Sequence, residues 1–338
     1  MPERPRLTPE MADVRRAVRE LLASVAEPGE LVLVGLSGGA DSLALAAATA
    51  FEAPKLGLRA GAVIVDHGLQ AGSADVAARA AEQARALELD PVVIRPVEVI
   101  AADGPEADAR TARYAALEAV RTEVGATWVL LAHTLDDQAE TVLLGLTRGA
   151  GATSLAGMAP VTGTLLRPLL GIRRAQTVAA CAGAQLEVWS DPHNEDSAYT
   201  RVRIRREVLP LLERELGPGV AEALTRTADQ LRDDTAVLDA LAAEILPQVT
   251  LGLLGEHGSA LAGLDVAALA AQPDAVRNRV LRLTALNVFG VSLSAAHTAS
   301  IARLITDWHG QGEIHLPGIR VERNGSQLEF RAAPQSTS

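Results

Sequence analysis

One short segment limits the folds open to this chain more than any other. The apolar run Leu31–Leu36 passes directly into Ser37-Gly38-Gly39-Ala40-Asp41-Ser42, and the small apolar residues that follow predict a helix over Asp41–Thr49. The two glycines allow a tight turn and close approach of the backbone to a ligand. Serine hydroxyls and exposed N–H groups at a helix start favour an anion there. The segment therefore predicts a strand, an anion-binding turn and a helix; the simpler alternative is a helix cap after a buried strand.

The first half of the chain predicts an α/β fold with a mainly parallel sheet, because apolar runs alternate with helical patterns. The expected strands are Leu31–Leu36, Gly61–Val65, Val92–Arg95 and Trp128–Ala132, with a further extended run at Thr164–Pro168. The expected helices are Asp41–Thr49, Ala74–Leu87, Ala107–Val124 and Asp136–Leu146. In such folds, ligands bind at the carboxyl ends of the strands.

The second half reads mainly as helices after a turn-rich linker at Trp189–Tyr199. We expect helices over Val202–Leu216, Val220–Ile245, Leu264–Leu286 and Ala295–Trp308, then extended segments Glu313–Leu316 and Ile319–Phe330. The last segment contains Asn324-Gly325, a hairpin signal. The predicted organisation is a catalytic domain over residues 1–200, an arginine-rich linker helix over 201–216 and a smaller, mainly helical domain over 217–338 that ends in a hairpin.

Composition restricts the class of protein. The 338 residues are 48% hydrophobic, which is typical of a globular chain. The single cysteine, Cys181, excludes an internal disulfide framework and any site built from several cysteines, and it indicates a reducing compartment. No apolar stretch reaches the roughly 18 to 20 residues of a membrane span, and the N-terminus has no apolar signal core. We expect a cytoplasmic protein that does not enter a membrane.

The charge distribution leaves nucleic acid open as a partner. The net charge of −11 taken alone argues against it, because phosphate binding needs local positive charge. Four arginines nevertheless crowd into one short segment, at Arg201, Arg203, Arg205 and Arg206. These form either a phosphate-binding patch or an ordinary solvated charge run.

Polar residues follow the expected second and fourth strands. Asp66 and His67 come directly after Val65, and His133 follows the fourth strand. Asp136 and Asp137 then open a helix, where acids are also common as caps. Asp137 and Glu140 are three residues apart and share one helix face, so they can hold Mg²⁺ on a nucleotide or bind a cationic substrate.

The glycine turn resembles the PP-loop, which grips the pyrophosphate of ATP in enzymes that transfer AMP. Further motifs occur in the order found in the tRNA(Ile)-lysidine synthase family, from about residue 30 to about residue 215. They are Asp66-His67-Gly68-Leu69, Arg110-Thr-Ala-Arg113-Tyr114, Ala132-His133-Thr134-Leu135-Asp136-Asp137-Gln138-Ala139-Glu140, Gly149-Ala-Gly151, Gly157-Met158, Arg167-Pro168-Leu169-Leu170, Asp191-Pro192-His193-Asn194 and Tyr199-Thr-Arg201-Val-Arg203-Ile-Arg205.

This resemblance implies a PP-loop ATP-binding domain and a ligase. Such an enzyme uses ATP, with Mg²⁺ expected, to adenylate the 2-carbonyl oxygen of the wobble cytidine in an isoleucine tRNA bearing a CAU anticodon. The amine of free lysine then displaces AMP. The resemblance assigns catalysis to Asp41, Arg113, Asp137 and Glu140. It assigns ATP binding to Ser37, Gly38, Gly39, Ala40, Asp41, Ser42, Asp66, His67 and His133, and tRNA binding to Arg201, Arg203, Arg205 and Arg206. Metal ligands are not assigned.

Two positions depart from the family pattern, and two other functions compete. Thr134 stands where the family usually has a second His, and His193 stands where it usually has Ser. A related PP-loop thiolation enzyme would need a cysteine relay or an iron–sulfur cluster, which one cysteine cannot supply. The other alternative is a nucleotide- or tRNA-binding module without catalysis. The sequence leaves open whether the chain is a monomer or a homodimer.

Overall fold

A computed structural model of the chain describes residues 7–66, 68, 72–97, 105–147, 151–189, 199–252 and 261–333. Backbone packing divides the chain into two compact units. The first comprises Met1–Thr147 and Gly157–Ala228, and the second comprises Arg148–Ala156 and Asp229–Ser338. The division falls inside helix α10 (Val220–Val249), and the arginine-rich segment 201–216 packs with the first unit. The functional division at residues 200 and 217 remains a prediction.

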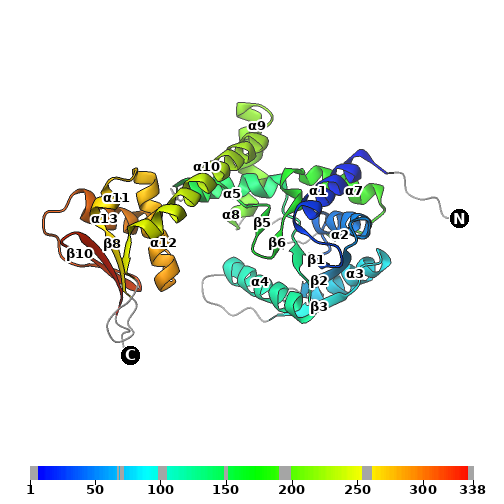
Figure 1. Cartoon of the computed structure of the whole chain (residues 1–338). Helices are drawn as coiled ribbons and strands as arrows, with labels where there is room; N and C mark the ends of the chain where they lie inside the picture. The colour runs from blue at the N-terminus through cyan, green and yellow to red at the C-terminus, as the bar shows by residue number, and fades with distance from the viewer. Residues whose placement is uncertain are drawn as a thin grey trace. The chain divides into compact units, whose positions relative to one another are not determined.

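The first unit is built on a six-stranded sheet, as the α/β prediction requires (Figure 1). Its strand order is β3-β2-β1-β4-β6-β5, and every neighbouring pair is parallel except β5 with β6. The strands are β1 (Leu31–Gly35), β2 (Arg59–Asp66), β3 (Val92–Pro96), β4 (Trp128–Leu130), β5 (Val161–Thr162) and β6 (Leu165–Leu166). The predicted strands are therefore confirmed.

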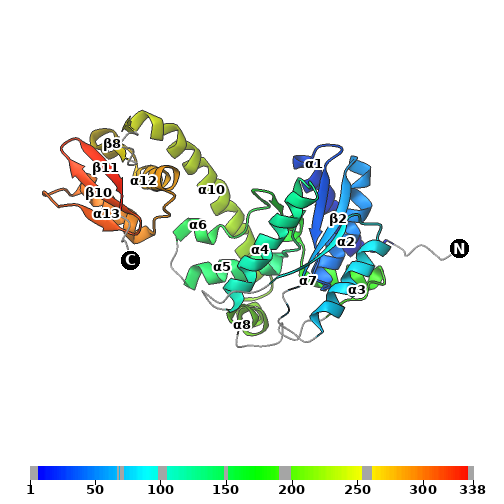
Figure 2. The same cartoon turned by 90° about the horizontal axis from the view of Figure 1, so that it is seen from below.

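Helices cover both faces of this sheet, which explains why its central strand is apolar without alternation. Val32 and Val34 pack into a core with α1, α2, α3 and α7, whereas Leu31 and Leu33 pack into a core with α4. Figure 2 shows α2 and α4 on opposite sides of the strands. The helices are α1 (Pro9–Val25), α2 (Ala40–Glu52), α3 (Ser73–Ala86), α4 (Pro105–Glu123) and α7 (Arg174–Gly183).

The sequence analysis did not predict helix α1. Thr8 caps it by accepting a hydrogen bond from the Met11 N–H at 3.2 Å, and Pro9 occupies its first position. Its buried side chains, Met11, Val14, Val18 and Leu22, recur at helical spacing and join the core.

Cys181 lies buried in α7 and belongs to the core on one face of the first sheet. None of the described helices is long and apolar enough to cross a bilayer.

Strand order explains where the site forms. β1 lies between β2 and β4, so the chain leaves β1 on one side and returns on the other. At such a switch point, the loops after neighbouring strands turn to opposite faces and leave a crevice. Ser37–Gly39 follow β1, and His133 follows β4 just before helix α5 (Leu135–Thr147). Both predicted nucleotide-binding loops therefore border the same crevice.

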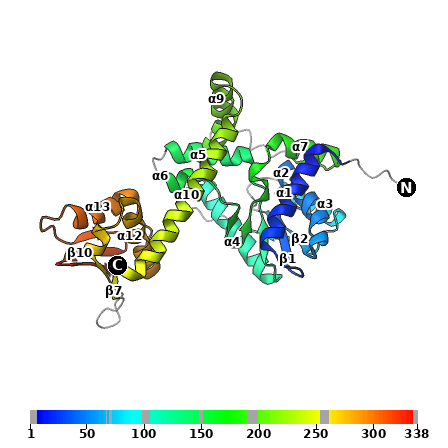
Figure 3. The same cartoon turned by 45° about the horizontal axis from the view of Figure 1, so that its top comes forward.

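The second unit contains a sheet that the sequence analysis did not anticipate. Five antiparallel strands in the order β7-β8-β11-β10-β9 share a core with α10, α11, α12 and α13 (Figures 1 and 3). The strands are β7 (Thr250–Gly252), β8 (Leu261–Asp265), β9 (Ile314–Leu316), β10 (Ile319–Asn324) and β11 (Gln327–Ala332). The predicted hairpin is confirmed, since Asn324 pairs with Gln327 across its turn.

The helix expected over Leu264–Leu286 was wrong at its beginning. Leu261–Asp265 forms β8, which pairs with both β7 and β11, and only then come α11 (Val266–Ala270) and α12 (Asp274–Phe289). Two local signals account for the difference. Asp265 caps α11 by accepting a hydrogen bond from the Ala268 N–H at 2.7 Å. Pro273 is the N-cap of α12, and it disfavours a helical conformation in the residue before it, so one helix cannot run through this point. Helix α13 (Ala295–Thr306) agrees with its prediction.

The arginine-rich segment is helical but not uniformly so. It runs through α8 (Thr200–Arg203), a wider π-type turn at Ile204–Val208 and α9 (Leu209–Leu216). The Leu209 N–H bonds back to the Ile204 carbonyl, five residues earlier, and Pro210 has no N–H to continue an α-helical ladder. The wide turn contains Arg205 and Arg206.

Gly157 provides a test of the packing beside α5. Its φ of +62° lies in the left-handed region, and a Cβ there would come within 2.5 Å of Oε1 of Gln138. The buried Gln138 side chain holds both backbone groups of Met158, at 2.7 and 2.8 Å. We expect Gly157→Ala to lower the free energy of unfolding by about 3 kcal/mol, measured by urea denaturation.

Gly125→Ala is the matched control for this change. Gly125 has a similar φ of +68°, but a Cβ there would meet nothing within 4 Å. Gly125→Ala should lower the free energy of unfolding by about 1 kcal/mol, because only the backbone strain at a positive φ is added. Equal losses in the two variants would mean that the Gln138 contact contributes nothing.

Candidate active site

The loop after β1 has the geometry of an anion-binding turn. Gly38 has a φ of +84°, which only glycine adopts easily, and the Ser37 N–H donates to Oγ of Ser42 at 3.1 Å. The two serine hydroxyls lie 3.1 Å apart, and Ser42 also bonds to the Gly39 carbonyl at 3.0 Å. No side chain caps α2, whose N-cap is Gly39. The first N–H groups of α2 and its positive dipole end are therefore available to phosphate oxygens.

A cavity of about 490 Å³ opens beside this loop. Predicted site residues that line it are Ser37, Gly39, Ala40, Asp41, Ser42, Arg113, His133, Asp137, Arg205 and Arg206. The other lining residues are Gly35, Ala132, Arg174, Val178, Val188 and Trp189. Side chains from the loop after β1, the start of α5, α4, α7 and the wide turn thus face one space.

Asp137 combines the capping role and the site position that the sequence left as alternatives. Its Oδ2 accepts hydrogen bonds from the N–H and the hydroxyl of Thr134, at 2.8 and 2.7 Å, which caps α5. Its Oδ1 accepts from Arg174 at 2.6 Å on the cavity side. Thr134, which departs from the family pattern, is fully buried and is used to fix this carboxylate.

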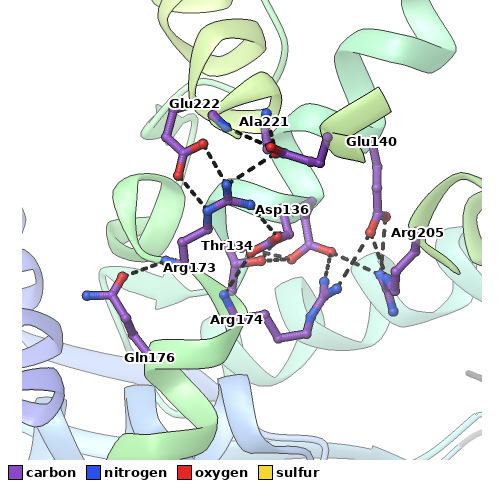
Figure 4. A network of polar contacts seen from close by, with 12 residues as sticks. Thr134, Asp136, Glu140, Arg173, Arg174, Gln176, Arg205, Ala221 and Glu222 are labelled. Atoms are coloured by element: carbon purple, nitrogen blue, oxygen red, sulfur yellow. Dashed lines mark hydrogen bonds and ion pairs between the residues drawn. The ribbon is translucent and has the colours of Figure 1, made fainter. Parts of the chain in front are cut away.

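Arg174 connects three acids that come from two different helices. Figure 4 shows Arg174 together with one of them, Glu140, and with Arg205. Its guanidinium lies 3.3 Å from Asp41, 2.6 Å from Asp137 and 3.6 Å from Glu140. Asp41 also accepts a hydrogen bond from the Thr177 hydroxyl on α7. Arg174 therefore ties the helix after the glycine turn to the acidic start of α5.

Arg205 approaches the same acids from the wide turn. Its Nε and Nη2 bind the two oxygens of Glu140 at 2.7 and 3.1 Å, and Nη2 lies 3.3 Å from Asp137. Glu140 is completely buried, so this paired geometry supplies the compensation that a buried carboxylate needs. The residue that the sequence assigns to tRNA thus binds the acids that it assigns to catalysis.

Burial and the guanidinium groups act on the carboxyl pKa values in opposite directions. Burial raises the pKa values of Asp41 and Glu140, and the nearby arginines offset this only in part. For Asp137, burial also acts upward, but Arg174 and the Thr134 hydrogen bonds outweigh it and lower the pKa. Asp137 is therefore the acid of this group that the surroundings hold most firmly in the charged form.

Arg173, which precedes Arg174 in the chain, forms a second network of ion pairs beside the first. It lies 3.0 Å from Asp136, and its Nε and Nη2 bind Glu222 at 2.7 and 2.5 Å. Glu213, which lies 3.5 Å from Arg173, accepts from the Gly219 and Ala221 N–H groups at the start of α10. This second network joins the start of α7 to α5, α9 and α10 within the first unit.

Arg113 and His133 face the cavity without polar partners. No described residue makes a hydrogen bond or ion pair with the Arg113 guanidinium, whose pKa is lowered by burial. Nδ1 of His133 is buried and unbonded. Burial, with Arg113 and Arg167 nearby, lowers the pKa of His133 to about 3, although Asp137 acts upward. At neutral pH the site therefore contains a neutral imidazole, His133, and a guanidinium, Arg113, that is not paired with any residue of the described ranges.

Several predicted site residues lie elsewhere. Gly38 lines a smaller cavity beside α3, and Glu140 lines one that also includes Asp136 and Arg173. Asp66, at the end of β2, accepts from the Gly68 N–H at 3.0 Å. Arg201 and Arg203 on α8 do not line the main cavity. His67 and the Asp191–Asn194 motif fall outside the described residues.

The sequence analysis missed Arg173, Arg174, Thr177 and Trp189. A local signal existed for the first two, because Gly171-Ile-Arg173-Arg174 follows the Arg167-Pro168-Leu169-Leu170 motif and opens an alanine-rich helix. Arginines at the start of a helix oppose its dipole, which implies acidic partners from elsewhere. Those partners, Asp41 and Asp137, are distant in the sequence and could not be identified from spacing.

The described residues contain no group of three or more His, Cys, Asp or Glu side chains arranged to hold a metal ion. All four carboxylate oxygens of Asp41 and Asp137 already accept hydrogen bonds. Mg²⁺ commonly needs only one or two carboxylates together with substrate phosphates. These two acids would fit such shared coordination, and a protein-only site is not formed by the described side chains.

We expect Arg174→Ala to destabilise the first unit, because Asp41, Asp137 and Glu140 lose a shared partner. The loss should be about 3 kcal/mol in the free energy of unfolding, measured by urea denaturation. The control is Arg16→Ala, since Arg16 makes only an exposed pair with Asp13 at 2.9 Å and should contribute under about 1 kcal/mol. A loss no larger than the control would contradict the bridging role of Arg174.

His133 should make the protein less stable in mild acid. The unfolded chain protonates this imidazole near pH 6.5, but the folded chain does so only near pH 3. The folded state therefore binds fewer protons between these values, and its stability falls as the pH drops below 6.5. The contribution is about 2 kcal/mol between pH 7 and pH 5. His133→Asn should lose less stability over this range than the wild type, as measured by urea denaturation at pH 7 and pH 5.

Comparison with known proteins agrees with this geometry. The PP-loop domain family matches residues 11–212, and the TilS substrate binding domain matches residues 264–327. The tRNA(Ile)-lysidine synthase of Leifsonia xyli subsp. xyli is 60% identical over 303 residues, 90% of each chain. Those of Thermobifida fusca and Mycobacterium tuberculosis H37Rv are 54% and 52% identical, over 92% and 83% of each chain.

Among solved structures, the U34-tRNA thiolase NcsA from Methanococcus maripaludis aligns with a TM-score of 0.56 at 20% identity. The alignment covers 66% of this chain and 79% of that one, and it supports the PP-loop fold alone. The matched domains and the identity over most of the chain show that the chain belongs to the tRNA(Ile)-lysidine synthase family of PP-loop proteins.

Proposed function

We propose that the protein ligates lysine to the wobble cytidine of an isoleucine tRNA with a CAU anticodon, at the expense of ATP. The observation that carries this proposal is the single cavity in which the uncapped Ser37–Ser42 turn faces Arg113 and the acidic start of α5. Its support from relatives is their family name, their high identity and the matched TilS substrate binding domain.

The reaction divides into two displacements. The 2-carbonyl oxygen of cytidine attacks the α-phosphorus of ATP, and pyrophosphate leaves. The amine nitrogen of lysine then attacks C2, AMP departs with the former carbonyl oxygen, and the amine loses its proton. The first step develops charge on phosphate oxygens, which the free N–H groups of α2 and the loop hydroxyls are placed to stabilise.

Arg113 is the proposed contact for the activated nucleotide. It lines the cavity and has no hydrogen bond or ion pair to any of the described residues, so binding a phosphate breaks no contact within that part of the chain. Its lowered pKa follows from burial, which an anionic ligand would offset. His133 is neutral at physiological pH, and its Nδ1 has no hydrogen-bond partner among the described residues, so a bound nucleotide could supply one.

The proposed lysine site is the acid pair Asp137 and Glu140. Both acids now bind arginines, so the lysine ammonium would replace or share one of these cations. Arg205 is the better candidate for displacement, since Arg174 also bonds Asp41 and is held from both sides. In this proposal, Arg205 exchanges its acid partners for an RNA phosphate as the tRNA binds, with Arg201, Arg203 and Arg206 as further phosphate contacts.

Mg²⁺ in this proposal is shared between ATP phosphates and the carboxylate of Asp41. A cytoplasmic location follows from the tRNA substrate and the lone cysteine. Oligomeric state does not enter the proposal, so a homodimer is not required. The competing thiolation reaction is disfavoured, because the only cysteine is buried and its pKa is raised to about 12 by burial and Asp41.

The test incubates the purified chain with ATP, radiolabelled lysine and a CAU isoleucine tRNA transcript. We expect label in the tRNA and release of AMP and pyrophosphate. No label with lysine, together with modification supported by a sulfur donor, would overturn the proposal.

Asp137→Asn should separate the two steps. It keeps the size of the side chain but removes the negative charge and replaces one acceptor oxygen with an amide donor. Lysine incorporation should therefore fall at least about 100-fold while tRNA-dependent ATP–pyrophosphate exchange persists. The matched control is Asp136→Asn, which removes the same charge from the preceding residue, outside the main cavity. Equal losses in both variants would remove Asp137 from the lysine site.

A further inference from the structure

One tryptophan of the second unit is exposed. Trp308 follows α13 and is 40% exposed, whereas Phe330 is fully buried and Phe289 packs against the core. The other two tryptophans belong to the first unit. Trp128 hydrogen-bonds Glu30 at 3.1 Å, and Trp189 lines the main cavity. The exposed part of the Trp308 indole is a rigid aromatic surface that a ligand can cover.

The Trp308 ring is held in place by Arg323 of the hairpin. The guanidinium carbon lies 4.6 Å from the ring centroid, a cation–π distance. Its Nη1 donates to the Leu304 carbonyl at 3.0 Å, and its Nε donates to the Gly325 carbonyl at 3.0 Å. These bonds join the last turn of α13 to the hairpin turn, so the ring rests on a cation that is itself fixed by the backbone.

This cation keeps its charge. The groups that accept hydrogen bonds from Arg323 are neutral carbonyls, and no described acidic residue forms an ion pair with it. Arg303, in the last turn of α13, is exposed and has no hydrogen bond or ion pair among the described residues. Arg323 therefore places beside Trp308 a cation that no described acidic residue pairs with.

The surroundings of Trp308 favour a nucleic acid over a protein partner. Its neighbours Asp307, His309, Gly310 and Gln311 are exposed and not apolar. A protein interface or a membrane would usually require a contiguous apolar patch, which is not present in this described stretch. An isolated aromatic ring that rests on an arginine without a described acidic partner suits the stacking of an unpaired base, with its phosphates nearby.

We propose that Trp308, supported by Arg323, is a stacking platform for an unpaired nucleobase of the tRNA, and that Arg303 contacts an adjacent phosphate. The inference rests on the proposed function for the identity of the RNA. It assigns to the second unit a contact with RNA that is separate from the chemistry in the first unit.

The test measures binding of the full-length protein to the tRNA transcript by filter binding at several salt concentrations. Trp308→Ala should raise the Kd by roughly 5- to 100-fold, and Trp308→Phe should retain most of the affinity. Because stacking releases no counterions, the slope of log Kd against log salt should stay unchanged in Trp308→Ala. Arg303→Ala should instead reduce that slope by about 0.7 to 0.9.

Leu286→Ala is the matched control, since Leu286 is 52% exposed in the same unit and has no assigned contact with RNA. Unchanged tRNA affinity in Trp308→Ala, or equal weakening in Leu286→Ala, would overturn the platform. Lysine incorporation by the wild type is measured in the same preparation. If it is absent while Trp308→Ala still weakens tRNA binding, the proposed function fails and the platform stands.

Discussion

The Arg174 guanidinium is the interaction on which the rest of the site depends. Asp41 lies at the start of α2 and Asp137 at the start of α5, and both partly buried carboxylates line the main cavity. Without a shared cation, burial and mutual repulsion would push the two carboxylates apart or into their protonated forms. Arg174 holds them together and thereby sets the position of the glycine turn relative to the acids of α5.

Strand order makes this convergence possible. The reversal between β1 and β4 brings the loop before α2 and the loop before α5 to one crevice, so phosphate-binding N–H groups and acidic side chains face each other. The buried Thr134 then fixes the rotamer of Asp137 through two hydrogen bonds. Backbone topology supplies the coarse placement, and local hydrogen bonds supply the fine orientation.

Local chemistry explains which parts of the fold could be predicted from the sequence. The strands of the first sheet could be predicted because burial on both faces leaves continuous apolar runs. The hairpin could be predicted because Asn-Gly is a local turn signal. β8 was not visible, because Leu261–Asp265 runs directly into the alanine-rich segment Val266–Ala271, which has a helical pattern. The strand state of β8 depends on pairing with β7 and β11. Such pairing is a property of distant residues and overrides weak local preference.

The same distinction applies to the site. The glycine turn and the acids of α5 carry their own signals, since glycine spacing and helix-start acids are local patterns. The position of Arg174 depends on contacts with residues far away in the sequence, and the partners of Arg205 were not deducible from four closely spaced arginines. The structure separates those four, because the wide turn directs Arg205 and Arg206 into the main cavity while Arg201 and Arg203 do not line it.

Charge is used differently in the two units, and this resolves the conflict between a net charge of −11 and an RNA partner. In the first unit, Arg173, Arg174 and Arg205 form ion pairs with buried or half-buried acids. Their positive charge is therefore offset and adds little to the electrostatic potential outside the protein until a ligand replaces the acids. In the second unit, Arg323 bonds neutral carbonyls and keeps its full charge beside an exposed indole. Net charge averages over both situations, whereas phosphate binding responds only to cations that lack acidic partners. An acidic chain can therefore bind RNA at arginines that have no acidic partner. Whether each arginine is paired with an acid predicts the site of RNA binding better than the net charge does.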